Sequence, residues 1–138
     1  MKSILLLAAS VLALSACQPT DQSLDGRWRV QQIAGASLGE AVEIWMEFDS
    51  AEHTVSGFTG CNTFTAPLST FGETIAIGPL SEGAGECSSM AAATDEQRFM
   101  LVLPQVQRRI QRGKSLELLQ AVSGNETLIR LRRDDAAE

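Results

Sequence analysis

Hydrophobic and polar residues alternate most regularly between Val42 and Asp49. Every second position is apolar, and the positions between them are acidic or aromatic. A period of two places the apolar side chains on one face, so this segment predicts a half-buried β-strand. Further segments rich in Thr, Val, Ile and Phe are bounded by Gly, Pro or polar turns. They predict six more strands, at residues 27–35, 54–67, 74–80, 106–112, 115–122 and 127–133.

One segment has helical rather than strand spacing. Apolar residues fall at offsets 0, 3, 4, 7 and 11 from Phe99. Thr94 is the predicted N-cap, and Gln97 stands three positions later, as in a capping box. Because an interior proline costs about 3 kcal/mol, Pro104 predicts that the helix ends near Leu103.

The order of these elements predicts a mainly β fold with antiparallel pairing. Seven short strands are joined by short links, and the helix falls between the fourth and fifth strands. Strands that each bury one face favour a strongly curved sheet or a small barrel, with the helix plugging an open side.

The first residues are typical of a secretory signal. An apolar run from Ile4 to Leu14 follows Lys2 and is too short to span a bilayer. It ends in Leu14-Ser15-Ala16-Cys17, which resembles the bacterial lipobox. That resemblance implies a signal peptide at 1–16, followed at 17–24 by a lipidated Cys17 and a tether. The alternative is an ordinary cleaved signal in which Cys17 is incidental.

The residue after Cys17 bears on location. In Gram-negative lipoprotein sorting, Asp at this position retains the protein in the inner membrane, whereas this chain has Gln18. By that resemblance we expect a lipid-anchored protein of the cell envelope, on the periplasmic face of the outer membrane.

Two cysteines remain once Cys17 is set aside. Outside the cytoplasm disulfides persist, and Cys61 and Cys87 have no metal-like spacing. A disulfide closing the loop 62–86 is favoured, but two inert thiols or a reactive Cys61 stay open. His53, the only histidine, lies in a polar turn and is expected to be a solvated loop residue.

Charge excludes some partners. The chain has 11 basic and 17 acidic residues, a net charge of −6, which argues against non-specific nucleic-acid binding. Residues 18–97 carry 2 basic and 12 acidic residues, net −10, and residues 98–138 carry 8 and 5, net +3. Either the two parts face each other within one domain, or the second forms a basic strip for lipid headgroups or cell-wall polymer. No cofactor or metal is expected.

The run Gly57–Phe64, which contains Gly60-Cys61-Asn62, resembles the core motif of the META domain, the HslJ-like lipoproteins of the bacterial envelope. Gly26–Val30 resembles the first strand of that family. Glu96 and Phe99 resemble its helix, and Leu116–Leu118 its closing hairpin. The likeness covers residues 25–133 and leaves 134–138 as a polar tail.

This resemblance implies a mainly antiparallel, lipocalin-like partial barrel of about seven strands with one α-helix. It also implies an envelope-stress context, with no general enzymatic activity established. The family usually has a Thr shortly before its second Cys. Here Ser81 is the only hydroxyl between Leu80 and Cys87, so the role of that Thr is not transferred.

The candidate site comprises Gly57, Gly60, Cys61 and Asn62, with Trp45 beside it. The glycines could expose backbone N–H groups, and Asn62 offers a donor and an acceptor. The same residues could instead be purely structural. Trp45 stands on the acidic face of its strand, so either another element covers it or it contacts a partner.

Three functions follow. The first is a non-catalytic, membrane-anchored monomer that binds an unknown envelope protein or supports outer-membrane integrity. The second is a small barrel that holds a lipid or another apolar ligand. The third is a redox enzyme that uses Cys61. The absence of a Walker or dinucleotide motif favours the first.

Overall fold

The computed structural model of the protein describes residues 23–120 and 126–137. The predicted signal peptide at 1–16, Cys17 with its lipid, and the tether up to residue 22 lie outside the described residues. So does most of the predicted turn at 123–126.

Ten strands, one α-helix and two short 3-10 helices make up the described chain. In chain order they are β1 Gly26–Ile33, β2 Ala36–Ser37, β3 Trp45–Asp49, β4 Thr54–Phe58, β5 Thr63–Phe71, β6 Thr74–Ile77, β7 Ser81–Glu82, α1 Met90–Val102, η1 Leu103–Gln105, β8 Arg108–Arg112, β9 Ser115–Leu119, β10 Thr127–Arg133 and η2 Asp135–Ala137.

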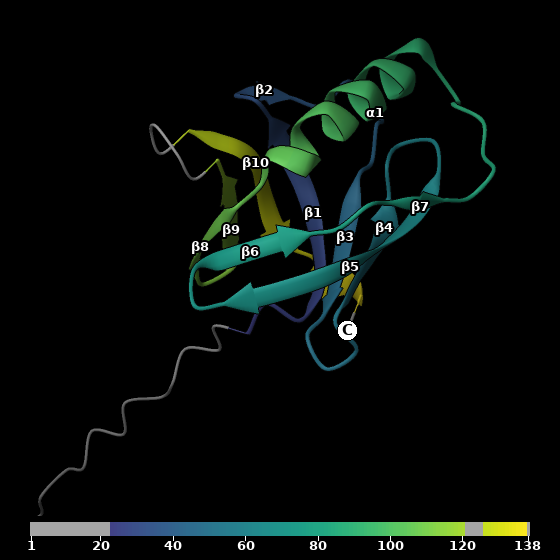
Figure 1. Cartoon of the computed structure of the whole chain (residues 1–138). Coiled ribbons are helices and arrows are strands. Elements are labelled where there is room, and N and C mark those ends of the chain that lie inside the picture. The colour runs from purple at the N-terminus through teal and green to yellow at the C-terminus, as the bar shows by residue number, and fades with distance from the viewer. Residues whose placement is uncertain (1–22, 121–125, 138) are drawn as a thin grey trace, which may run out of the picture.

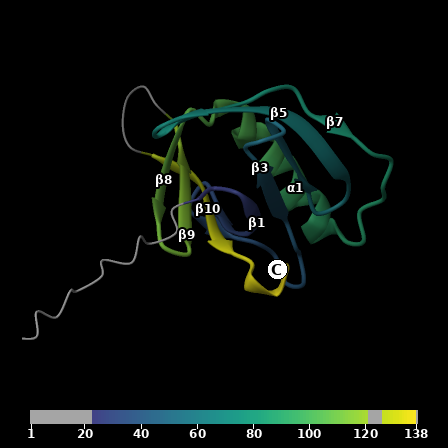
Figure 2. The ribbon, with the colours of Figure 1, turned by 90° about the horizontal axis from the view of Figure 1, so that it is seen from below.

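Eight of the strands form a closed antiparallel barrel (Figures 1 and 2). They follow the order β10-β9-β8-β6-β5-β4-β3-β1, and β1 pairs with β10 to complete the ring. Two short strands pair outside this ring, β2 with β1 and β7 with β5. The predicted class, a mainly antiparallel barrel with one helix, is confirmed.

The single strand predicted at 54–67 is wrong, because the chain reverses there. β4 and β5 form a hairpin whose turn contains Gly60, which has a φ of +105°. Pro67 does not end the second strand, since β5 continues to Phe71. Instead, β5 pairs with β4 as far as Pro67 and with β6 from Leu68 onward.

The helix begins five residues earlier than predicted. Ser89, not Thr94, is the N-cap, because its hydroxyl accepts a hydrogen bond from the N–H of Ala92 at 3.0 Å. The hydroxyl of Thr94 donates to the carbonyl of Met90 within the helix. The predicted end is confirmed, since α1 stops at Val102 and Pro104 lies in η1. Within the described chain, neither α1 nor the 3-10 turns are long and apolar enough to span a bilayer.

The helix lies across one end of the barrel (Figure 1). Its Phe99 is fully buried, with its ring centroid 6.0 Å from that of Phe64 on β5. This end is called the helix end below. The described chain starts and finishes at the opposite end, called the chain-start end.

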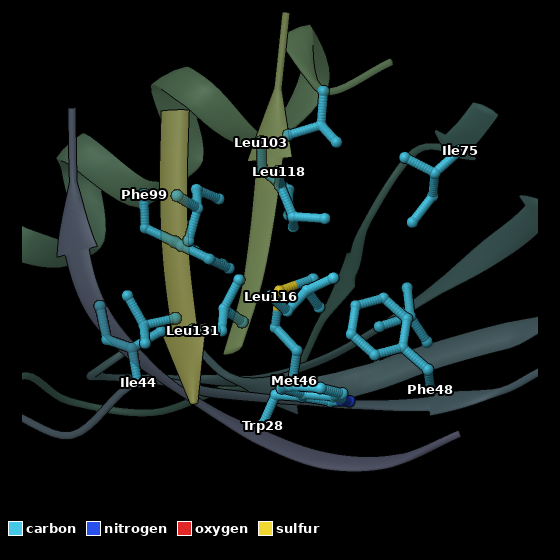
Figure 3. Close-up of a cluster of buried hydrophobic side chains, with 14 of the residues drawn as sticks. Trp28, Ile44, Met46, Phe48, Ile75, Phe99, Leu103, Leu116, Leu118 and Leu131 are labelled. Atoms are coloured by element: carbon cyan, nitrogen blue, oxygen red, sulfur yellow. The ribbon is translucent and has the colours of Figure 1, made fainter. Parts of the chain in front are cut away.

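Large apolar side chains fill the barrel interior (Figure 3). The fully buried ones include Trp28, Phe48, Phe64, Phe99, Ile33, Ile44, Met46, Ile75, Leu103, Leu116, Leu118 and Leu119. Val42 and Ile44 were predicted inside a strand, but β3 begins only at Trp45. Ile44 nevertheless accepts a hydrogen bond from the N–H of Val30 and keeps its side chain in the core.

Both predicted domain ends need correction. Leu24, assigned to the tether, is buried, and its carbonyl accepts a hydrogen bond from Trp28 Nε1 at 2.8 Å. Asp134, assigned to the polar tail, is also buried, and its backbone N–H donates to Arg27. The complete barrel and its core therefore lie between Leu24 and Asp134.

Candidate functional site

Three of the residues that the sequence singled out, Gly60, Cys61 and Asn62, lie in the turn between β4 and β5. This turn, Thr59-Gly60-Cys61-Asn62, is called here the GCN turn. The backbone N–H of Thr59 donates to the carbonyl of Asn62 at 2.8 Å, and the N–H of Asn62 donates to the Thr59 hydroxyl at 3.0 Å. Thr59 is fully buried. A buried hydroxyl that accepts a local backbone N–H stabilises a tight turn.

Gly57 sits where β4 is squeezed between its neighbours. A Cβ at this position would lie 2.1 Å from the carbonyl oxygen of Trp45 and 2.7 Å from the ring of Phe64. Gly57 pairs with strands on both sides, opposite Met46 and Phe64. Glycine is required here because any side chain would collide with the backbone of β3.

Glu96, on the second turn of α1, holds the GCN turn against the helix. Its Oε1 accepts hydrogen bonds from the hydroxyl of Thr59 and from Asn62 Nδ2, the latter at 2.8 Å. The amide of Asn62 is therefore engaged within the fold. This favours the structural interpretation of the motif.

A disulfide between Cys61 and Cys87 makes the second connection, with their Cα atoms 4.4 Å apart. Of the three interpretations that the sequence left open, the structure contains this one. Gly85 packs against the same turn, since a Cβ there would lie 2.3 Å from the carbonyl oxygen of Cys61. The disulfide thus ties the loop that precedes α1 to the GCN turn.

Glu96 also lies close to the sulfur atoms. Its Oε2 is 3.5 Å from Cys87 Sγ, and the potential ligand atoms of Cys61, Cys87 and Glu96 lie within 4.8 Å of one another. Thiolates bind metals, whereas these two sulfurs are joined to each other. In this form the cluster is a structural clamp.

Asp95 forms a further anchor beside this clamp. It is buried, and its carboxylate accepts from the N–H of Gly39 at 2.6 Å and pairs with Arg98 at 2.7 Å. Arg98 in turn donates to the carbonyl of Ile33 at the end of β1. These bonds attach the helix to the barrel rim.

Trp45 and His53 lie apart from the clamp. The half-buried ring of Trp45 is covered by a side chain of the neighbouring strand β1, with the Arg27 guanidinium 3.8 Å from the ring centroid. His53 is exposed in the turn before β4, whereas the GCN turn follows β4. A strand of this length separates them by about 20 Å, so His53 and Cys61 cannot form a Cys-His pair.

Ionised groups concentrate at the chain-start end. The Arg29 side chain hydrogen-bonds Asp134 at 2.9 Å, which lowers the pKa of that carboxyl and raises the pKa of the guanidinium. Hydrogen bonds from Ser50 lower the pKa of Asp25. These contacts join the two termini of the described chain to the barrel.

Sequence reasoning missed the roles of Thr59, Glu96 and Asp95. A hydroxyl residue directly before Gly60 is a turn signal and could have identified Thr59. Nothing local indicated that Glu96 reaches a turn 34 residues away. Its role depends on how the helix lies across the barrel.

The fold and site define a class: a small antiparallel β-barrel with one end covered by a helix, which a disulfide and a carboxylate tie to a hairpin turn. The family model of the META domain matches residues 21–135, and the chain belongs to this family. The resemblance found in the sequence is confirmed.

Solved structures share this fold at low sequence identity. An NMR structure of a protein from Burkholderia xenovorans has a TM-score of 0.62 and 15% identity, covering 80% of this chain and 83% of that one. A second NMR structure has a TM-score of 0.61 and 13% identity, covering 82% and 92%. No curated protein matches the chain significantly.

Proposed function

We propose that this META domain protein is a non-catalytic lipoprotein of the cell envelope, anchored by Cys17, whose barrel and helix bind a partner protein. The position of Ser23, where the described chain starts, supports the anchoring part of this proposal. Ser23 is exposed at the chain-start end, six residues after Cys17. Six extended residues span at most about 21 Å. An acylated Cys17 would therefore hold the barrel close to a bilayer, with α1 on its far side.

The lipobox resemblance supplies the anchor chemistry. A single acyl chain binds a membrane only reversibly, whereas two or more hold a protein there for practical purposes. Acylation of both the thiol and the freed amine of Cys17 would meet this requirement. Gln18 supports placement on the periplasmic face of the outer membrane.

The outward face of α1 suits a partner. Met90 is 83% exposed and Leu101 is 66% exposed. They are 11 residues apart, close to three helical turns, so both lie on one side of the helix. These two apolar side chains offer a partner protein two points of contact on one face of the helix. We expect the protein to be a monomer until it meets this partner.

Replacement of Cys17 tests the anchor. We expect Cys17→Ser to move the protein from the membrane fraction to the soluble fraction, because no acyl chain can be attached. The disulfide between Cys61 and Cys87 should form unchanged in the variant, which controls for folding. Persistent membrane fractionation of a folded Cys17→Ser protein would contradict the proposal.

Site-specific crosslinking tests the partner. A photo-crosslinking residue in place of Leu101 should give one adduct of reproducible mass in intact cells. The same residue in place of Thr65, exposed on the barrel wall, serves as the control and should give none. Repeated failure to find an adduct at Leu101 would count against a protein partner.

The two alternatives have less support. An apolar ligand inside the barrel would need space that buried side chains such as Trp28, Met46 and Phe48 occupy. Mass spectrometry of organic extracts from the purified protein would reveal such a ligand. A redox role would need the sulfur of Cys61, which is buried and joined to Cys87. Titratable thiols in the native protein, with loss of function in Cys61→Ser, would revive it.

A further inference from the structure

A hollow of about 450 Å³ runs across the outer wall of the barrel, over β8, β9 and β10 and onto β1. Four exposed cationic side chains line it, and no carboxylate does among the described residues. The four are called the basic face: Arg112, Lys114, Arg130 and Arg132. Gln31, Gln32 and Ser115 add neutral polar groups.

Strand register places these cations together. Arg132 on β10 pairs with Ser115 on β9, and Ser115 pairs with Arg112 on β8. Adjacent strands lie about 4.8 Å apart, so the two arginines are about 10 Å apart with a hydroxyl residue between them. The alternate residues Leu116 and Leu131 are buried, so this side of each strand faces solvent.

Nearby carboxylates neutralise only part of this charge. Glu117 pairs with Arg130 at 3.1 Å and with Arg112 at 3.7 Å, and Asp135 pairs with Lys114 at 2.6 Å. Four cations and these two anions leave two positive charges. Among the described residues, Arg132 has no carboxylate within ion-pair distance.

The basic face lies beside the first described residue. The carbonyl of Ser23 accepts hydrogen bonds from Arg133 on β10 and from Gln111 on β8. Arg133 and Gln111 are the strand neighbours of Arg132 and Arg112, so their side chains point to the opposite face of the sheet. The basic face therefore lies on the outer wall but reaches the rim at the chain-start end. The described chain starts at the end opposite α1 (Figure 1). An anchor six residues before Ser23 would therefore bring the rim of the basic face, rather than α1, close to the membrane surface.

We propose that the basic face binds the headgroup phosphates of anionic phospholipids in the membrane that holds Cys17, which rests on the proposed anchoring. From Cys17 onward the chain has 10 basic and 17 acidic residues, a net charge of −7 that repels an anionic bilayer. The tether overcomes this by raising the effective concentration of the face at the membrane. Once bound, the face fixes the barrel's orientation and leaves the outer side of α1 free for a partner.

The reactivity of Lys114 toward an amine reagent measures whether the basic face is bound. Lys114 is the only lysine of the chain besides Lys2, and its side chain is 61% exposed. Lipidated full-length protein is incorporated into vesicles of phosphatidylcholine, alone or mixed with phosphatidylglycerol, and recovered by flotation. A water-soluble amine reagent is then added, and the rate of Lys114 modification is measured by mass spectrometry. We expect roughly tenfold slower modification on the anionic vesicles, with the difference removed by high salt.

Two double variants with the same change in charge provide the control. Arg112→Gln with Arg132→Gln removes two charges from the basic face, and should restore fast modification on anionic vesicles. Arg27→Gln with Arg108→Gln removes two charges elsewhere, where Arg27 pairs with Glu47 and Arg108 with Glu73. This control variant should retain the slow modification of Lys114 on anionic vesicles. Thermal unfolding checks that both variants are folded.

The remaining outcomes overturn the proposal. Equal rates on neutral and anionic vesicles, or slow rates in both double variants, would show that the basic face does not bind headgroups, while flotation would still support the anchor. Protection of Lys114 by isolated cell-wall polymer but not by anionic vesicles would assign the face to another ligand. Wild-type protein that does not float with either vesicle would overturn the anchoring as well.

Discussion

The two ends of the barrel are held by different kinds of interaction. At the helix end, a disulfide and the shared carboxylate of Glu96 tie buried and half-buried groups of the GCN turn to α1 and its preceding loop. At the chain-start end, Arg29, Arg133 and Lys114 form ion pairs and hydrogen bonds that reach the surface.

This difference predicts unequal contributions to stability. Partly buried hydrogen bonds to a charged group are more costly to break than exposed ones, since water replaces the lost partner only incompletely. Exposed ion pairs gain little, because water and salt already screen the charges. The helix end should therefore determine global stability, and the chain-start end should respond to pH and salt.

Removal of the disulfide should have the largest effect. Cys61→Ser with Cys87→Ser frees a loop of 25 residues and should lower the free energy of unfolding by about 3 kcal/mol. Urea denaturation measures this difference. Wild-type protein under reducing conditions should show a similar loss. If the urea midpoint is unchanged in both the double variant and the reduced wild type, the disulfide does not stabilise the fold.

Loss of the Glu96 carboxylate should come next. Glu96→Ala leaves the Thr59 hydroxyl and the Asn62 amide without their acceptor and should cost about 1–3 kcal/mol. Glu96→Gln keeps one carbonyl oxygen, so its free energy of unfolding should lie between those of Glu96→Ala and wild type. If urea midpoints for both match wild type, the carboxylate does not stabilise the turn.

At the chain-start end, acid should reveal the pair of Arg29 and Asp134. Arg29 lowers the pKa of Asp134, so its stabilisation is present above the unfolded value of about 3.9 and is lost as pH falls through the lower folded value. Melting temperatures recorded across this range should therefore fall less steeply for Asp134→Asn than for wild type. Glu52→Gln, which also removes one exposed carboxylate, is measured beside it as the control for the change in net charge.

The smallest effect is expected for the exposed pair of Lys114 and Asp135. Lys114→Ala should change the free energy of unfolding by no more than about 0.5 kcal/mol, and added salt should abolish the difference. A loss as large as that of Glu96→Ala would mean that the two ends do not differ as described.

The sequence by itself determined the fold class and the approximate position of most strands, but not the reversal within residues 54–67. The alternation around Met46 and Phe48 identified a strand with its core face, and Pro104 identified the end of the helix, because both signals are local. The cysteine count and the short Gly60-Cys61-Asn62 motif indicated the family and the region of the disulfide.

Only the tertiary structure decided how these parts meet. Closure of the barrel depends on pairing of β1 with β10, about a hundred residues apart in the chain. The contacts of Glu96 with Thr59 and of Arg29 with Asp134 depend on the same packing. Local preference predicts backbone conformation and burial, whereas the partner of a polar side chain is chosen by which distant segments the barrel brings within hydrogen-bond distance.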